Sequence, residues 1–149
     1  MDFLEAKEEY ASALRQGQKE YKEMLAAGKS PHPAVLDDLL DESIANVVQD
    51  VGLVELPAER IVGTRSAGRI TTFSPSFLPL ANPNSEFALK WTSLCLAHLE
   101  EGIRDAITCY EYLGNFYVEE GNKRVSVLRY FGAPRVSGMV KRILPPRSE

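Results

Sequence analysis

Apolar residues at helical spacing mark the N-terminal third of the chain. From residue 2 to 27 aromatic and aliphatic positions recur about every third or fourth residue, and Gly28 follows where a helix usually ends. The apolar positions between 33 and 49 predict a second helix, with Pro33 in its first turn. The two segments therefore predict an N-terminal helical hairpin over residues 1–50, whose plain periodicity indicates packing rather than chemistry.

After Gly52 the pattern changes to short segments. Residues 53–56 predict a strand, and the Pro-initiated stretch 57–61 predicts one helical turn. Residues 63–84 are rich in Gly, Pro and Asn and predict a long loop, which Phe73 and Phe77 should hold against the core. Loops of this length often carry binding residues.

The C-terminal half predicts a compact alternation of helix and strand. A helix over 85–101, capped by Asn84 or Ser85, precedes a hairpin over 107–119 with its turn at Gly114-Asn115. A helix over 122–131 and a strand over 136–143 follow. The fold class is therefore α+β, in which a small mixed sheet from 53–56, 107–112, 116–119 and 136–143 is flanked by helices. The predicted units are the hairpin 1–50 and a domain over 51–149.

Composition narrows the class of protein. Of 149 residues 44% are hydrophobic, which is too many for a disordered chain, and no apolar run approaches the 18 residues of a membrane span. The acidic start is unlike a secretory signal. Cys95 and Cys109 make neither a disulfide framework nor a metal-ligand set, so we expect a reducing, cytoplasmic location, with no membrane partner. Cys95 falls on the apolar face of a predicted helix, where we expect it to be a small buried side chain.

Charge is distributed unevenly along the chain. Residues 1–50 hold 5 Lys or Arg against 11 Asp or Glu, whereas residues 121–149 hold 7 against 1. This asymmetry is consistent with an anionic partner near the C-terminal third, and equally with two solvated faces of opposite sign. Non-specific contact with a DNA backbone is one form of the first interpretation.

The segment 119–124, Glu-Glu-Gly-Asn-Lys-Arg, is the richest in chemistry. It lies where a strand is predicted to lead into a helix, whose first amides have no partner within the helix. Lys123 and Arg124 each oppose the helix dipole there by about 0.3–1 kcal/mol. A bound phosphate would offset that cost. Local cancellation by Glu119 or Glu120 is the alternative, and spacing alone does not decide between them.

The order of elements from Leu94 to Ile143, with Gly121-Asn-Lys-Arg124 at its centre, resembles the N-terminal domain of the ParB partition proteins and the wider ParB/sulfiredoxin-like fold. Residues 53–69 resemble the opening strand of that family. The central signature of the family, Gly-x-x-Arg, holds nucleotide phosphates. The resemblance implies that Gly121 permits close approach, that Arg124 meets phosphate oxygens, and that Asn122 and Lys123 fill the variable positions. It further implies a second phosphate-binding arginine at Arg69 and pocket-lining roles for Arg104 and Asp105.

Departures from the family limit what the resemblance implies. Sulfiredoxins carry a cysteine where this chain has Asn122, so the nucleophile of their chemistry is missing. Residues 1–149 show neither the acidic-Asn box that holds the metal in ParB proteins nor a helix-turn-helix, so we expect neither metal-dependent CTP hydrolysis nor specific DNA reading here.

The resemblance thus implies a ParB-like nucleotide- or phosphate-binding module from a DNA-partition or regulatory protein, which would bind DNA through that parent protein. CTP or ATP with Mg²⁺ is the implied ligand, and we expect no protein metal site. Two alternatives stay open. In the first, the chain is an enzyme of phosphotransfer or nucleotide hydrolysis, with Glu120 or Glu119 as base or metal ligand; Glu120 matches the acid of related small-molecule kinases. In the second, the chain is an interaction domain with a degenerate pocket, and its acidic helices form a partner surface or a homodimer arm.

Overall fold

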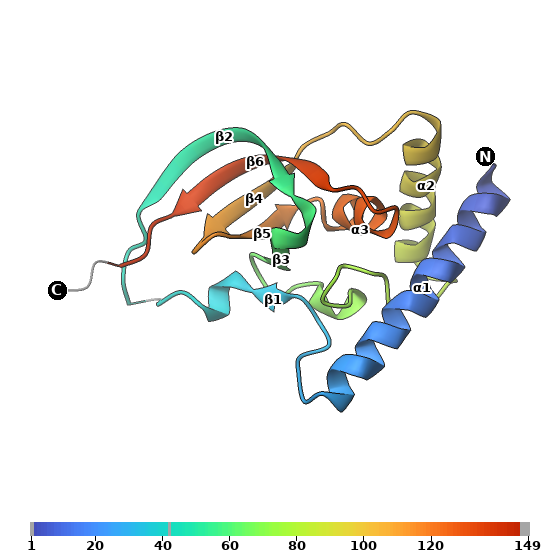
Figure 1. Cartoon of the computed structure of the whole chain (residues 1–149), viewed down its shortest axis with the longest axis horizontal. Coiled ribbons are helices and arrows are strands. Elements are labelled where there is room, and N and C mark those ends of the chain that lie inside the picture. The colour runs from blue at the N-terminus through green and yellow to red at the C-terminus, as the bar shows by residue number, and fades with distance from the viewer. Residues whose placement is uncertain (1, 42, 147–149) are drawn as a thin grey trace.

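The computed structural model describes residues 2–41 and 43–146, which fold into helices on one side of a mixed sheet (Figure 1). The helices are α1 (Phe3–Ala26), α2 (Glu86–Glu100) and α3 (Asn122–Tyr130). The strands are β1 (Ala34–Val35), β2 (Val48–Pro57), β3 (Ile61–Thr64), β4 (Ile107–Tyr112), β5 (Asn115–Glu120) and β6 (Arg135–Ile143). Single turns of 3₁₀ helix occur at Leu36–Asp38, Ala58–Arg60 and Ile70–Thr72. The predicted α+β class is confirmed.

The sheet has the strand order β1-β3-β5-β4-β6-β2. Its pairs β2–β6 and β4–β5 are antiparallel, and its pairs β1–β3, β3–β5 and β4–β6 are parallel. All four predicted strands are present, and β2 is longer than the predicted 53–56. The hairpin between β4 and β5 turns at Leu113 and Gly114, where both φ angles are positive, one residue earlier than expected.

The predicted second helix over 33–49 is wrong. Residues 34–35 pair with β3, residues 36–38 form a 3₁₀ turn, and β2 begins at Val48. Leu36 is fully buried in a cluster with Tyr117 and Ile143, so packing on the sheet decides the conformation here and overrides a weak local preference. In place of the predicted hairpin of residues 1–50, the structure has the single helix α1, the short strand β1 and a 3₁₀ turn. Strand β2 runs through the predicted domain boundary at residue 50.

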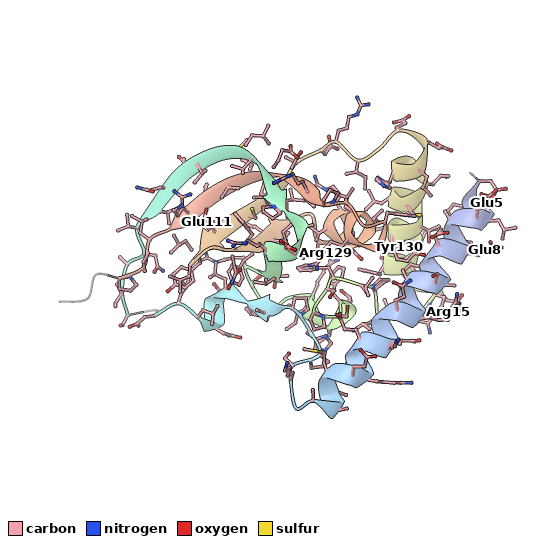
Figure 2. All side chains as sticks on the ribbon, viewed as in Figure 1. Glu5, Glu8, Arg15, Glu111, Arg129 and Tyr130 are labelled. Carbon is pink, nitrogen blue, oxygen red and sulfur yellow. The ribbon has the colours of Figure 1, made fainter. Side chains whose placement is uncertain are left out.

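Helix α1 packs against α2 through one narrow stripe. Tyr10 on this stripe meets the ring of Trp91 edge to face, with 5.3 Å between centroids, and a Cβ at Gly17 would overlap the carbonyl oxygen of Pro79. The side chains of Glu5, Glu8 and Arg15 lie on the opposite, exposed face of the helix (Figure 2). Helix α1 is thus held against the rest of the chain by close packing.

The long loop packs down as predicted, although β3 takes its first residues. Phe73 and Phe77 are buried, and Glu20 of α1 accepts hydrogen bonds from the backbone and hydroxyl of Ser76 at 2.9 and 2.6 Å. Beyond the loop, the hydroxyl of Ser85 accepts from the amide of Ala88 and caps α2, one of the two caps predicted. These contacts fix the loop beside the N-termini of α2 and α3.

Candidate functional site

Gly121 connects β5 to α3 and must be a glycine. Its φ is 111°, and a Cβ there would lie 2.6 Å from the Cγ2 of Ile107 and 3.2 Å from the Nη2 of Arg124. A side chain would be strained by the backbone and would collide with the core. The structure thus accounts for this glycine by the turn and its packing, which leaves the predicted close approach of a ligand untested.

The first turn of α3 begins with backbone amides that have no acceptor within the helix. The first hydrogen bond of the helix runs from the amide of Val125 to the carbonyl of Gly121 at 3.0 Å. The amides of Asn122, Lys123 and Arg124 precede this bond, so they carry the positive end of the helix dipole. These three groups can donate to an anion that approaches along the helix axis.

A cavity of about 220 Å³, here called the α3 cavity, lies at this helix N-terminus. Residues 121–124 line it together with Arg69, Leu94 and the rings of Phe73 and Phe87. Three of its lining side chains are cationic, and no carboxylate lines it among residues 2–41 and 43–146. The structure therefore brings five predicted site residues together: Arg69, Gly121, Asn122, Lys123 and Arg124.

Lys123 stands in an environment that disfavours its charge. Its ammonium lies 5.3 Å from the centroid of Phe87, and burial, followed by the positive charges of Arg69 and Lys90, lowers its pKa. Glu86 opposes this shift. In turn the pKa of Glu86 is lowered, first by its hydrogen bond and charge interaction with Lys90. An anion in the α3 cavity would relieve the mutual repulsion of these cations.

Arg124 is held in one orientation by the loop before β4. Its Nη1 donates to the carbonyl oxygens of Asp105 and Ala106 at 3.1 and 2.8 Å. The same side chain lines a second cavity of about 660 Å³, here called the loop cavity, which shares Leu94 and Arg124 with the α3 cavity. Glu100, Glu101, Arg104 and Asp105 also line it, so the two predicted loop residues lie beside the α3 cavity and not within it.

Glu119 and Glu120 lie apart from both cavities. Both are exposed at the end of β5, and neither is among the residues that line the α3 cavity or the loop cavity. No salt bridge within the described part of the chain involves them. The alternative of local charge cancellation thus finds no support in the geometry, and the role of Glu120 as a base stays a prediction.

Phe73, Phe87, Lys90 and Glu86 belong to this region but were not among the predicted site residues. Glu86 and Lys90 form an i,i+4 ion pair at 2.9 Å near the start of α2. Their spacing is visible in the sequence, but their proximity to Lys123 depends on how α2 packs beside α3. Phe73 reaches the cavity because of the path that the long loop takes. The sequence predicted that Phe73 anchors this loop, but no pattern in the sequence predicts the loop's path.

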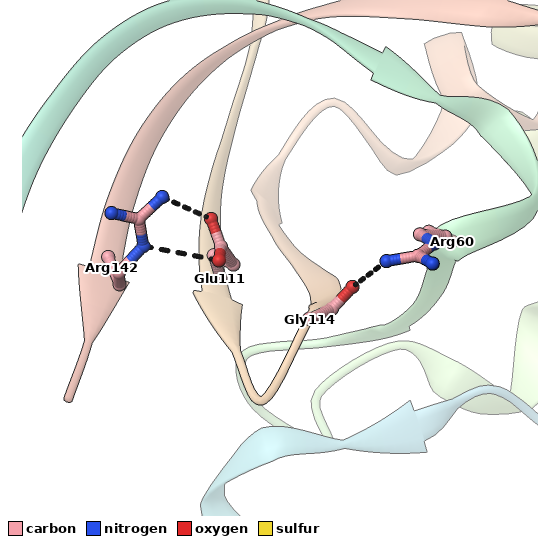
Figure 3. Close-up of polar contacts among 4 residues, drawn as sticks. All are labelled: Arg60, Glu111, Gly114 and Arg142. Atoms are coloured by element: carbon pink, nitrogen blue, oxygen red, sulfur yellow. Dashed lines mark hydrogen bonds and ion pairs between the residues drawn. The ribbon is translucent and has the colours of Figure 1, made fainter. Parts of the chain in front are cut away.

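Two arginines of the basic C-terminal stretch are engaged in contacts within the fold. Arg142 donates Nε and Nη2 to the two carboxylate oxygens of Glu111, each at 3.1 Å, as Figure 3 shows. Arg129, labelled in Figure 2, donates to the carbonyl oxygen of Ile61 at 3.0 Å. Arg147 lies outside the described residues. Part of the predicted positive charge is therefore engaged within the fold.

The two cysteines are buried, as predicted for Cys95. Burial, with a smaller contribution from Glu111, raises the pKa of Cys109 to about 12, and burial raises that of Cys95 to about 11. The thiolate is the reactive form, so neither side chain is suited to act as a nucleophile near neutral pH.

Both thiols are expected to resist an aromatic disulfide reagent in the native protein at pH 8 and to react fully in urea. Because folding raises both pKa values, the fold favours the protonated thiols. This stabilisation is complete below the unfolded value near 9 and is lost as the pH rises through about 11 and then about 12. Spectrophotometric thiol counting checks this, and rapid native reaction of one thiol would contradict it.

No group of three or more His, Cys, Asp or Glu side chains is placed to hold a metal ion in residues 2–41 and 43–146. No helix there combines the length and apolar character needed to cross a bilayer.

Comparison with known proteins gives one weak likeness. No family model matches the chain, and no curated protein matches it. Among solved structures, sulfiredoxin from Arabidopsis thaliana is similar at 23% sequence identity and a TM-score of 0.41, over 59% of this chain and 82% of that one. A likeness of this degree leaves open what the chain binds.

Proposed function

We propose that the chain is a phosphate-binding module that holds a nucleotide or another phosphate-bearing ligand at the N-terminus of α3. The observation that carries this proposal is the convergence of three helix-leading amides with Arg69, Lys123 and Arg124 around the α3 cavity. Amides at a helix N-terminus and guanidinium groups are both good partners for phosphate oxygens. The absence of a lining carboxylate among the described residues favours an anion over a cation there.

CTP and ATP are the natural nucleotides to test, since the Gly121-x-x-Arg124 turn resembles the phosphate-binding turn of ParB-like modules. On this proposal the module serves a larger DNA-partition or regulatory protein. The side chains around the α3 cavity are cationic, apolar or amide in the described chain, so they offer no carboxylate to a magnesium ion. Any Mg²⁺ would therefore be held chiefly by the phosphates and water.

The test is a calorimetric titration of the full chain with CTP, ATP, ADP and inorganic phosphate at low ionic strength. Replacing Lys123 by Gln is expected to weaken binding roughly 10- to 100-fold, because a hydrogen bond to a charged group contributes about 1.5–3 kcal/mol. Lys29→Gln removes an exposed lysine from the turn after α1 and is the matched control, which should bind like the original chain.

Binding should also weaken as salt is raised, because the site is partly open to solvent. Failure of every phosphate ligand to bind would reject the proposal and favour an interaction domain with a degenerate pocket. Equal binding by Lys123→Gln and the original chain would place the anion elsewhere.

A further inference from the structure

The α3 cavity is too small to hold a whole ligand. Its volume is about 220 Å³, whereas cavities that enclose a small organic molecule usually measure about 300–1,000 Å³. It can accept one anionic group, with the remainder of the ligand extending out of it. The loop cavity, of about 660 Å³, is large enough for that remainder.

The two cavities adjoin at a fixed side chain. Both are lined by Leu94 and Arg124, and Arg124 is held between them by its bonds to the carbonyls of Asp105 and Ala106. The Nη2 of Arg124 lies next to Gly121, where a Cβ would approach it to 3.2 Å. Leu94 and Arg124 therefore form the boundary that the two cavities share, and a group bound beside Gly121 lies next to the loop cavity.

The sign of charge changes from one cavity to the other. Arg69, Lys123 and Arg124 line the α3 cavity without an acid among the described residues, whereas Glu100, Glu101 and Asp105 line the loop cavity with Arg104 as its own cation. Carboxylates accept hydrogen bonds from hydroxyl and amino groups, and they repel further phosphates. The loop cavity thus suits a body rich in donors and poor in negative charge.

We propose that the ligand is a phosphomonoester, whose single phosphate binds in the α3 cavity and whose hydroxyl- or amino-bearing organic body occupies the loop cavity. This inference rests on the proposed function and narrows its ligand. Nucleoside monophosphates are selected over the corresponding triphosphates, because the additional phosphates of a triphosphate exceed the small cavity and would lie among the carboxylates of the larger one.

The experiment compares CMP with CTP, AMP with ATP, and all four with inorganic phosphate, by calorimetry on the full chain at constant ionic strength without Mg²⁺. Each monophosphate is expected to bind at least severalfold more tightly than its triphosphate and about tenfold more tightly than inorganic phosphate. The tenfold difference corresponds to about 1.4 kcal/mol of contacts made by the organic body.

A double variant, Glu101→Gln with Asp105→Asn, distinguishes binding in the loop cavity from binding in the α3 cavity. It should weaken monophosphate binding severalfold, since two acceptors for the body are lost, while inorganic phosphate binds as well as before or better, since nearby negative charge is removed. Structural damage would weaken both ligands alike. Glu8→Gln, on the exposed face of α1, is the control and should change the affinity for neither the monophosphate nor inorganic phosphate.

Three results would overturn the inference. If triphosphates bind as tightly as monophosphates, or if the double variant shifts both ligands in the same direction, the inference fails while the phosphate site stands. If none of the phosphate compounds binds, the proposed function fails and the inference fails with it.

Discussion

Replacement of Arg124 by alanine should weaken phosphate binding roughly 10- to 100-fold, since it removes a charged donor worth about 1.5–3 kcal/mol. The same change removes two hydrogen bonds, from Nη1 to the carbonyls of Asp105 and Ala106, which hold the loop before β4. Amide hydrogen exchange should therefore speed up over residues 102–106 while the sheet stays protected. Calorimetry and exchange measured by mass spectrometry check the two effects.

Arg124→Lys is the informative companion. Lysine keeps the charge but lacks the planar guanidinium, whose several N–H donors can reach the two carbonyls and the cavity at the same time. Arg124→Lys should therefore keep part of the phosphate affinity but little of the protection of residues 102–106 against amide hydrogen exchange. Full phosphate affinity in Arg124→Ala would contradict the assignment of Arg124 to the site, and unchanged exchange in the loop would contradict its positioning role.

Replacement of Trp91 by alanine is expected to have the largest effect on stability, a loss of about 3–5 kcal/mol. Trp91 is fully buried between α1, α2 and α3, where its Nε1 donates to the hydroxyl of Ser126 at 2.9 Å. Its ring meets those of Tyr10 and Tyr130 edge to face. The variant thus leaves both a cavity and a buried hydroxyl without its partner.

Urea unfolding followed by far-ultraviolet circular dichroism measures this loss, because Trp91 is the single tryptophan and the variant has no tryptophan fluorescence to follow. Trp91→Phe should lose less stability than Trp91→Ala, because it keeps most of the apolar volume and loses the hydrogen bond to Ser126. One cooperative transition is expected, because α1 shares this core. A separate early transition of α1, or a loss below about 1 kcal/mol, would contradict the packing described here.

The sequence predicted best those elements whose pattern is long or whose ends carry a chemical signal. Helix α1 has 24 residues with periodic apolar positions, α2 has the Ser85 cap, and α3 begins and ends near glycines with positive φ. Strands β1 and β3 were missed because they are short. Residues 33–49 were predicted wrongly because their apolar residues satisfy a helical pattern, whereas the structure buries only some of them and leaves Leu39, Ile44 and Val47 exposed.

The residues of the candidate site also differ in how far the sequence predicted them. Residues 121–124 are contiguous, so the sequence placed them together at a strand-to-helix junction. The junction alone left a bound phosphate and local charge cancellation open, and the phosphate-binding roles of these residues came from the family resemblance. Arg69 and Arg104 came from the family resemblance, and the structure places the first at the α3 cavity and the second beside it. The contributions of Phe87 and Lys90 arise from packing between helices, which no local pattern encodes.

Backbone amide NMR during a titration with inorganic phosphate tests the central claim most directly. The amide signals of Asn122, Lys123 and Arg124 should shift most, saturate together and report one dissociation constant. Saturable shifts confined to another part of the chain, or no saturable shift of these three amides at phosphate concentrations that perturb other signals, would contradict an anion site at the N-terminus of α3.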